Sequence, residues 1–113
     1  MDYSTARDLL QSQGSPTEDP NAFLMRLKQG KPPVPGQVTT LLLALKVLYE
    51  RLGGAEFLDR ELVHALYVLA IESRYYYDSG RQQGVNWPPL LDEDLMRIAI
   101  AVKSIFSGTW EGS

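Results

Sequence analysis

The sequence predicts an all-α fold, a small single-domain helical bundle of about five helices, three long and two short. Apolar side chains recur at steps of three and four residues, and glycines, prolines and capping residues separate the periodic segments. No segment shows the alternation of a β-strand. The 113 residues, 44% hydrophobic and 22% charged, have the size and composition of one globular domain, residues 1–113.

Two short helices are predicted near the amino terminus. The first covers Ser4–Gln13 and stops at Gly14-Ser15-Pro16, because glycine and proline both terminate helices. The second begins at Asp19-Pro20, where the aspartate can cap backbone amides and proline suits the first helical position, and it ends at Gly30. The apolar stripes are Ala6, Leu9 and Leu10 in the first helix and Phe23, Leu24 and Leu27 in the second.

The third predicted helix, Gln37–Leu52, follows a stiff proline-rich connector at Lys31–Pro35 and ends at Gly53-Gly54. Its periodic apolar residues are Val38, Leu41, Leu42, Leu45, Leu48 and Leu52. Leu43, Ala44 and Val47 widen the apolar surface beyond one stripe. We therefore expect this helix to lie at the centre of the bundle, with neighbours on more than one side.

A fourth helix is predicted to start near Asp59, a candidate N-cap, and to stop at Gly80 or Gly84. Its predicted buried face consists of Leu62, Val63, Leu66, Leu69, Ala70 and Ser73. A second proline-bearing loop, Val85–Leu91, follows it.

The fifth helix is predicted from Asp92, as its cap, to about Ser107, with Glu93 and Asp94 where the helix dipole favours acids. Its predicted face consists of Leu95, Ile98, Ala99, Val102, Ile105 and Phe106. Residues 108–113 are expected to form a flexible tail, from which Trp110 can dock on the domain. The short connections favour an antiparallel bundle, whereas the two longer proline loops leave orthogonal packing equally open.

Composition excludes several classes of protein and site. The chain has no cysteine, which rules out disulfides and thiolate metal sites and is consistent with a reducing cytoplasmic compartment. Its amino terminus is polar and acidic, unlike a secretory signal, and its longest apolar run, Leu41–Leu45, is too short to span a membrane. The net charge of −3, without a block of basic residues, argues against nucleic acid as a partner.

Catalytic constellations are not indicated. His64 is the only histidine and is interpreted as a boundary residue of its helix, and no G-x-S-x-G turn is present. Asp92–Asp94 are explained by a helix start better than by a metal site. Gly53-Gly54 precedes no lysine that could hold a phosphate, and Gly80–Gly84 is interpreted as a helix stop. The sequence therefore predicts no catalytic residue, no cofactor and no metal site.

The most unusual local feature is aromatic. Tyr75-Tyr76-Tyr77 lies in a helical segment and is followed by Trp87-Pro88-Pro89. Successive residues turn by about 100° around a helix, so at least one tyrosine ring faces the surface or a loop. Either these aromatics form an interface, or Trp87 folds back over the tyrosines within the domain. The candidate partner-binding residues are Arg74, Tyr75, Tyr76, Tyr77, Arg81, Trp87, Pro88 and Pro89.

Two stretches resemble a known family. They are Leu24–Val38, which reads LMRLKQGKPPVPGQV, and Asn86–Asp94, which reads NWPPLLDED. Both resemble a family of short cyanobacterial helical proteins of unknown activity, along most of the chain. The resemblance implies a photosynthetic bacterial host and supplies no catalytic motif. Some members carry a dethiobiotin synthetase label, which this sequence does not support because it lacks the G-x-x-x-x-G-K-[ST] motif.

The leading functional hypothesis is a non-catalytic helical module that binds another protein, as a regulator or assembly factor. One alternative is homo-oligomerisation through the apolar face of the third or fourth helix. Another is the binding of a small apolar ligand or pigment between helices.

Overall fold

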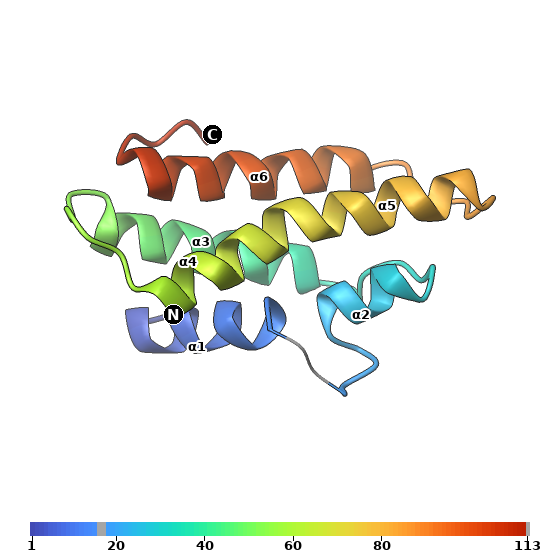
Figure 1. Cartoon of the computed structure of the whole chain (residues 1–113), viewed down its shortest axis with the longest axis horizontal. Helices are drawn as coiled ribbons and strands as arrows, with labels where there is room; N and C mark the ends of the chain where they lie inside the picture. Colours follow the sequence, from blue (N-terminus) through green and yellow to red (C-terminus); the bar gives the residue numbers. More distant parts are fainter. Residues whose placement is uncertain (16–17, 113) are drawn as a thin grey trace.

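The computed structural model describes residues 1–15 and 18–112, and within them the chain forms helices and loops, with no β-strand (Figure 1). The elements are α1 (Tyr3–Gln13), α2 (Phe23–Lys28), α3 (Gln37–Leu52), α4 (Arg60–Tyr67), the π-helical turn η1 (Val68–Glu72), α5 (Ser73–Gln82) and α6 (Leu91–Ser107). Since α4, η1 and α5 follow one another directly, they form one long helix, and the described residues contain the five predicted helical segments. Pro16, in the predicted stop of the first helix, lies outside the described residues, as does Ser113.

The helices pack in layers. The long helices α3 and α6 run in the same direction. The long helix α4–η1–α5, which lies between them in the sequence, runs in the opposite direction (Figure 1). Helix α3 packs against both α1 and α6, which confirms its predicted central position. The short helix α1 also contacts α4, and α2 contacts α5. The elements therefore form a bundle in which the long helix α4–η1–α5 runs antiparallel to α3 and α6, with α1 and α2 covering one side of it.

The start of α2 differs from its prediction. The helix begins at Phe23, after the predicted Asp19-Pro20. The Asp19 carboxylate accepts a hydrogen bond from the Asn21 backbone amide at 2.9 Å, and the Asp19 carbonyl accepts from the Ala22 amide at 3.2 Å. These bonds form a local turn that competes with helix formation, so the predicted cap precedes the helix instead of starting it.

Two further aspartates that were predicted as helix caps form ion pairs instead. Asp59 occupies the N-cap position of α4, but its side chain makes no capping bond and pairs with Arg7 of α1. Helix α6 begins at Leu91, which places Asp92 in the first turn, where its carboxylate pairs with Arg74 of α5. Asp59 therefore connects α4 to the distant α1, and Asp92 connects α6 to α5.

The predicted buried faces are largely confirmed. Leu62, Leu66, Leu69, Ala70 and Ser73 are buried on the long helix, and Leu95, Ile98, Val102 and Ile105 on α6. The prediction is wrong for Phe106, which is 44% exposed, and Ala99 is only half-buried. Both lie on the side of α6 that borders the long helix at the surface. Leu43 also faces solvent, so the apolar surface of α3 is less wide than its sequence suggests.

Candidate functional site

The predicted aromatic cluster is partly a core element. Trp87 and Tyr77 are both buried, and their rings stack with centroids 5.9 Å apart. The Trp87 Nε1–H donates to the Tyr77 carbonyl at 2.9 Å. Gly80 provides the space, because a Cβ atom there would lie 2.6 Å from the Trp87 ring. Trp87 therefore folds back over the long helix, and neither buried ring is available to a partner in this structure.

Arg74 joins this cluster to α6. Its guanidinium lies over the Tyr77 ring, 5.2 Å from the centroid, and pairs with the Asp92 carboxylate. The same group donates to the Asp92 carbonyl at 3.2 Å. These contacts tie α5 to the first turn of α6.

The remaining predicted residues separate into two surfaces. Tyr75 is 65% exposed and meets the half-buried Tyr76 edge to face, with centroids 5.6 Å apart. Arg81 is exposed at the end of α5, and Pro88 and Pro89 are exposed in the loop shortly before α6. The eight predicted residues thus do not form one continuous exposed site.

The π-turn η1 aligns three large exposed side chains on the long helix. They are Tyr67, Ile71 and Tyr75, each four residues from the next. In a regular α-helix, side chains four residues apart drift by about 40° around the axis, so three of them would spread over about 80°. A π-turn holds more residues per turn and shifts the register back. Tyr67, Ile71 and Tyr75 therefore follow one stripe.

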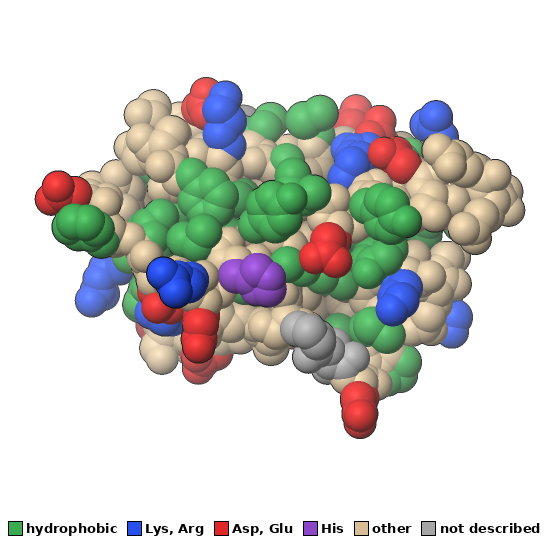
Figure 2. All heavy atoms as spheres, in the orientation of Figure 1, with side chains coloured by type: hydrophobic (Ala, Val, Ile, Leu, Met, Phe, Trp, Pro, Cys, Tyr) green, Lys and Arg blue, Asp and Glu red, His purple; other side chains and the backbone are tan. Residues whose placement is uncertain are grey.

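A groove runs between this stripe and α6. It has a volume of about 410 Å³, and its walls are almost entirely carbon. Tyr67, Ala70 and Ile71 line it from the long helix, and Ala99, Val102, Lys103, Phe106 and Ser107 from α6. Figure 2 shows hydrophobic side chains gathered over these two helices, on the face that α1 and α2 leave uncovered. We call this surface the α4–α6 groove.

The spacing of apolar residues within single helices did not indicate this groove. Tyr67 and Ile71 lie outside the predicted buried face, and Phe106 was assigned to the core of α6. The recurrence of tyrosine, isoleucine and tyrosine at four-residue steps was a signal for a second apolar face. Its pairing with α6 depends on how the two helices are aligned, which spacing within one helix does not specify.

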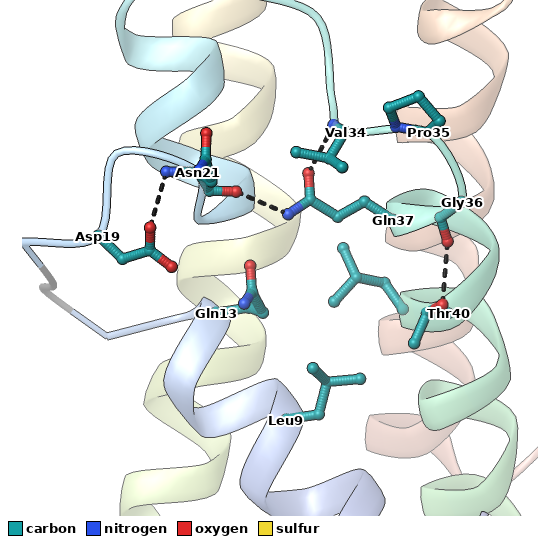
Figure 3. A pocket seen from close by; sticks show the side chains of 10 residues that line it. Leu9, Gln13, Asp19, Asn21, Val34, Pro35, Gly36, Gln37 and Thr40 are labelled. Atoms are coloured by element: carbon teal, nitrogen blue, oxygen red, sulfur yellow. Dashed lines mark hydrogen bonds between the residues drawn. The ribbon is translucent and has the colours of Figure 1, made fainter.

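A second hollow, of about 390 Å³, lies where the loops before α2 and α3 meet α1 (Figure 3). Gln37 spans it, since its Nε2 donates to the Asn21 carbonyl at 3.0 Å and its Oε1 accepts from the Val34 amide at 3.1 Å. Gln13 accepts from the Phe23 amide at 2.7 Å. These side chains satisfy backbone groups of the loops, so the hollow is a structural junction.

Several titratable side chains form ion pairs or lie at the surface. His64 is exposed, beside a hollow that Lys28, Glu72 and Tyr76 also line. Glu93 and Asp94 face Arg97 on the same helix, at 3.9 and 3.2 Å. In the described part of the chain, no three His, Asp or Glu side chains are grouped so that they could hold a metal ion.

Within residues 1–15 and 18–112, no helix has the length and apolar character needed to cross a membrane. Scans against protein-family models, curated proteins and solved structures found no match to this chain.

Proposed function

We propose that the protein is a non-catalytic helical interaction module that binds an amphipathic helix of another protein in the α4–α6 groove. The observation that carries this proposal is the exposed apolar stripe of Tyr67 and Ile71 opposite Phe106. Large exposed apolar patches on small proteins mark contact surfaces. A groove between two antiparallel helices presents the surface into which an amphipathic helix lays its apolar face.

One charged residue of the groove, Lys103, specifies the partner further. Lys103 lines the groove near Phe106, with a side chain that is largely exposed. Complementary charge sets the orientation of a partner more than its affinity. The expected partner helix therefore carries an acidic residue that shares the Lys103 ammonium with Glu111.

The cellular setting belongs to the same proposal. The resemblance to short cyanobacterial helical proteins supports a cyanobacterial host as part of the proposal, and the absence of cysteine supports a cytoplasmic setting. A regulator or an assembly factor needs a surface to hold a partner and no reactive cluster. The proposed role combines these two properties.

The experiment places a photo-crosslinking amino acid at Tyr67 and captures partners from a cyanobacterial lysate. The crosslinked segment is expected to be an amphipathic helix with the stated acidic residue, and Ile71→Asp is expected to abolish its capture. Leu43→Asp is the matched control, because Leu43 is exposed to a similar extent on α3. Retained capture by Ile71→Asp would contradict the proposed surface. Crosslinking to a second copy of this chain, with a dimeric mass in light scattering, would contradict the proposed occupant.

A further inference from the structure

A third hollow, of about 320 Å³, lies between α3 and α6 beneath the carboxyl-terminal segment, away from the α4–α6 groove. Its lining combines an apolar floor, an aromatic wall and two cations, and includes Leu42, Lys46, Arg97, Ile100, Ala101, Trp110, Glu111 and Gly112. We infer that this hollow binds a small organic acid, with the apolar body of the acid on the floor and its carboxylate between Lys46 and Arg97. We call it the Trp110 pocket.

The Trp110 wall is held in place by contacts on both sides. The Trp110 ring lies against Tyr49 of α3, with centroids 5.0 Å apart. The next residue, Glu111, donates its backbone N–H to Ser104 Oγ at 2.9 Å, and Ser104 Oγ donates to the Ile100 carbonyl at 2.8 Å. The predicted docking of Trp110 is thus confirmed, and a preformed wall lowers the entropy that a ligand loses on binding.

The charges at the pocket select an anion. The Lys46 ammonium lies 3.9 Å from the Trp110 ring centroid and makes no ion pair with any residue that the structure describes. Arg97 faces Asp94 and Glu93, but its guanidinium has five N–H donors and keeps some for a ligand. Glu111 is the acid in the lining, and Lys103 pairs with it at 3.4 Å.

The size and lining of the pocket define the class of ligand. A volume of about 320 Å³ is at the small end of ligand sites, which run from roughly 300 to 1,000 Å³. Leu42, Ile100 and Ala101 offer no hydrogen bonds beyond their backbones, so they receive a hydrocarbon chain or ring. A carboxylate at the rim gains charge-assisted hydrogen bonds from the two cations. The site therefore distinguishes a carboxylic acid from the alcohol of the same chain length.

The test is an NMR titration that follows the indole N–H signals of the two tryptophans. Sodium octanoate is expected to shift the Trp110 signal saturably and to leave Trp87 unchanged, because Trp87 is buried beside Tyr77. The neutral 1-octanol is expected to bind at least about tenfold more weakly, since it lacks the charge that Lys46 and Arg97 receive. Equal affinity for the two compounds, or an unmoved Trp110 signal, would overturn the inference.

Two variants complete the experiment. Lys46→Met keeps most of the unbranched side chain, removes its charge and is expected to weaken octanoate binding at least about tenfold without affecting 1-octanol. Lys31→Met, in the exposed proline-rich connector, is the matched control and is expected to bind as the wild type does. An unchanged Trp87 signal establishes that a variant is folded, and Lys46→Gln replaces any variant that is not. Unchanged octanoate affinity in the folded Lys46 variant would refute the site.

The inference is independent of the proposed interaction surface. Ile71→Asp, which removes the apolar character of the α4–α6 groove, is expected to keep its octanoate response at Trp110. A loss of partner capture with intact octanoate binding supports both statements. A loss of the octanoate response in Ile71→Asp would show that octanoate binds the groove and would overturn the pocket assignment.

Discussion

Gly14 ends α1 at the point where that helix crosses α4. A Cβ atom on Gly14 would lie 2.4 Å from the Ala65 carbonyl oxygen and 2.9 Å from the Ala65 Cα. Because both atoms belong to the backbone of a helix, they cannot rotate aside as a flexible side chain would. The absence of a side chain at Gly14 therefore permits the contact between α1 and α4.

Gly14→Ala is accordingly expected to lower the free energy of unfolding by about 1–3 kcal/mol, as overpacking does. Gly54→Ala is the control, because a Cβ atom there meets no atom within 4 Å and its change should stay within about 0.5 kcal/mol. Urea denaturation of both variants measures the difference. If the two variants had equal free energies of unfolding, α1 and α4 would be able to move apart without loss of stability, which would contradict the prediction.

Asp2 makes the amino-terminal cap of α1. Its carboxylate accepts from the Thr5 backbone amide at 2.8 Å, and this bond, with one from the Thr5 side chain, lowers the pKa of Asp2 below its ordinary value of 3.8. A lowered pKa in the folded state means that the ionised form stabilises the fold. This contribution is complete above the ordinary pKa and is lost as the pH falls through the lower, folded value.

Asp2→Ala is therefore expected to reduce the melting temperature at pH 7, and the deficit is expected to shrink as the pH falls below about 4. Asp2→Asn keeps a capping oxygen without the charge, so its difference from Asp2→Ala is expected to be independent of pH. Thermal denaturation followed by circular dichroism across this pH range tests the cap. A deficit of constant size would exclude the carboxylate charge as its cause.

At the scale of elements, the local sequence pattern predicted the positions of the helices better than the way in which they begin and connect. The bounds of α3 agree with prediction, because its periodic leucines end in two glycines. The start of α2 was wrong, because Asp19 closes a turn of its own. Sequence spacing left open whether Trp87 folds back, since that depends on the space above Gly80, and it gave no sign of the π-turn. The position of Trp87 and the α4–α6 groove depend on contacts between segments, which the spacing of residues within one helix does not encode.

The π-turn behaves as a single inserted residue in the long helix. Buried residues continue across it, from Leu62 and Leu66 before the turn, through Leu69 within it, to Ser73 and Tyr77 after it. Deletion of Ile71 is therefore expected to give a regular α-helix with the same buried face.

This deletion is expected to change the free energy of unfolding by less than about 1 kcal/mol, as exposed changes do, and to leave the Trp87 indole signal in place. Deletion of the exposed Asp78 is the control, because it lies in regular helix just before Gly80 and moves that glycine away from Trp87. The Asp78 deletion is expected to lower the free energy of unfolding by at least about 3 kcal/mol, because it disrupts the buried packing. Urea denaturation measures the free energy of unfolding of both deletion variants. Similar losses in the two variants would contradict the interpretation of the π-turn as one inserted residue.

At the scale of the whole molecule, the layered packing leaves one large face without a covering element. Helix α3 has neighbours on both sides, in α1 and α6, whereas the surface shared by α6 and the long helix has none within the described residues. The apolar side chains on that face therefore do not serve the core. Their removal is expected to affect binding more than folding.

A comparison of Ile71→Gln with Leu66→Gln tests whether the exposed apolar face contributes to folding. Ile71 is 50% exposed in the groove, whereas Leu66 on the same helix is fully buried. The groove variant is expected to lower the free energy of unfolding by less than about 1 kcal/mol, and Leu66→Gln by at least about 3 kcal/mol, since only the second leaves a polar group in the core. Urea denaturation at several protein concentrations gives both values. If Ile71→Gln proved as destabilising as Leu66→Gln, with a cost that grew with concentration, the face would be buried between two copies of the chain, and the partner helix would have to come from this protein itself.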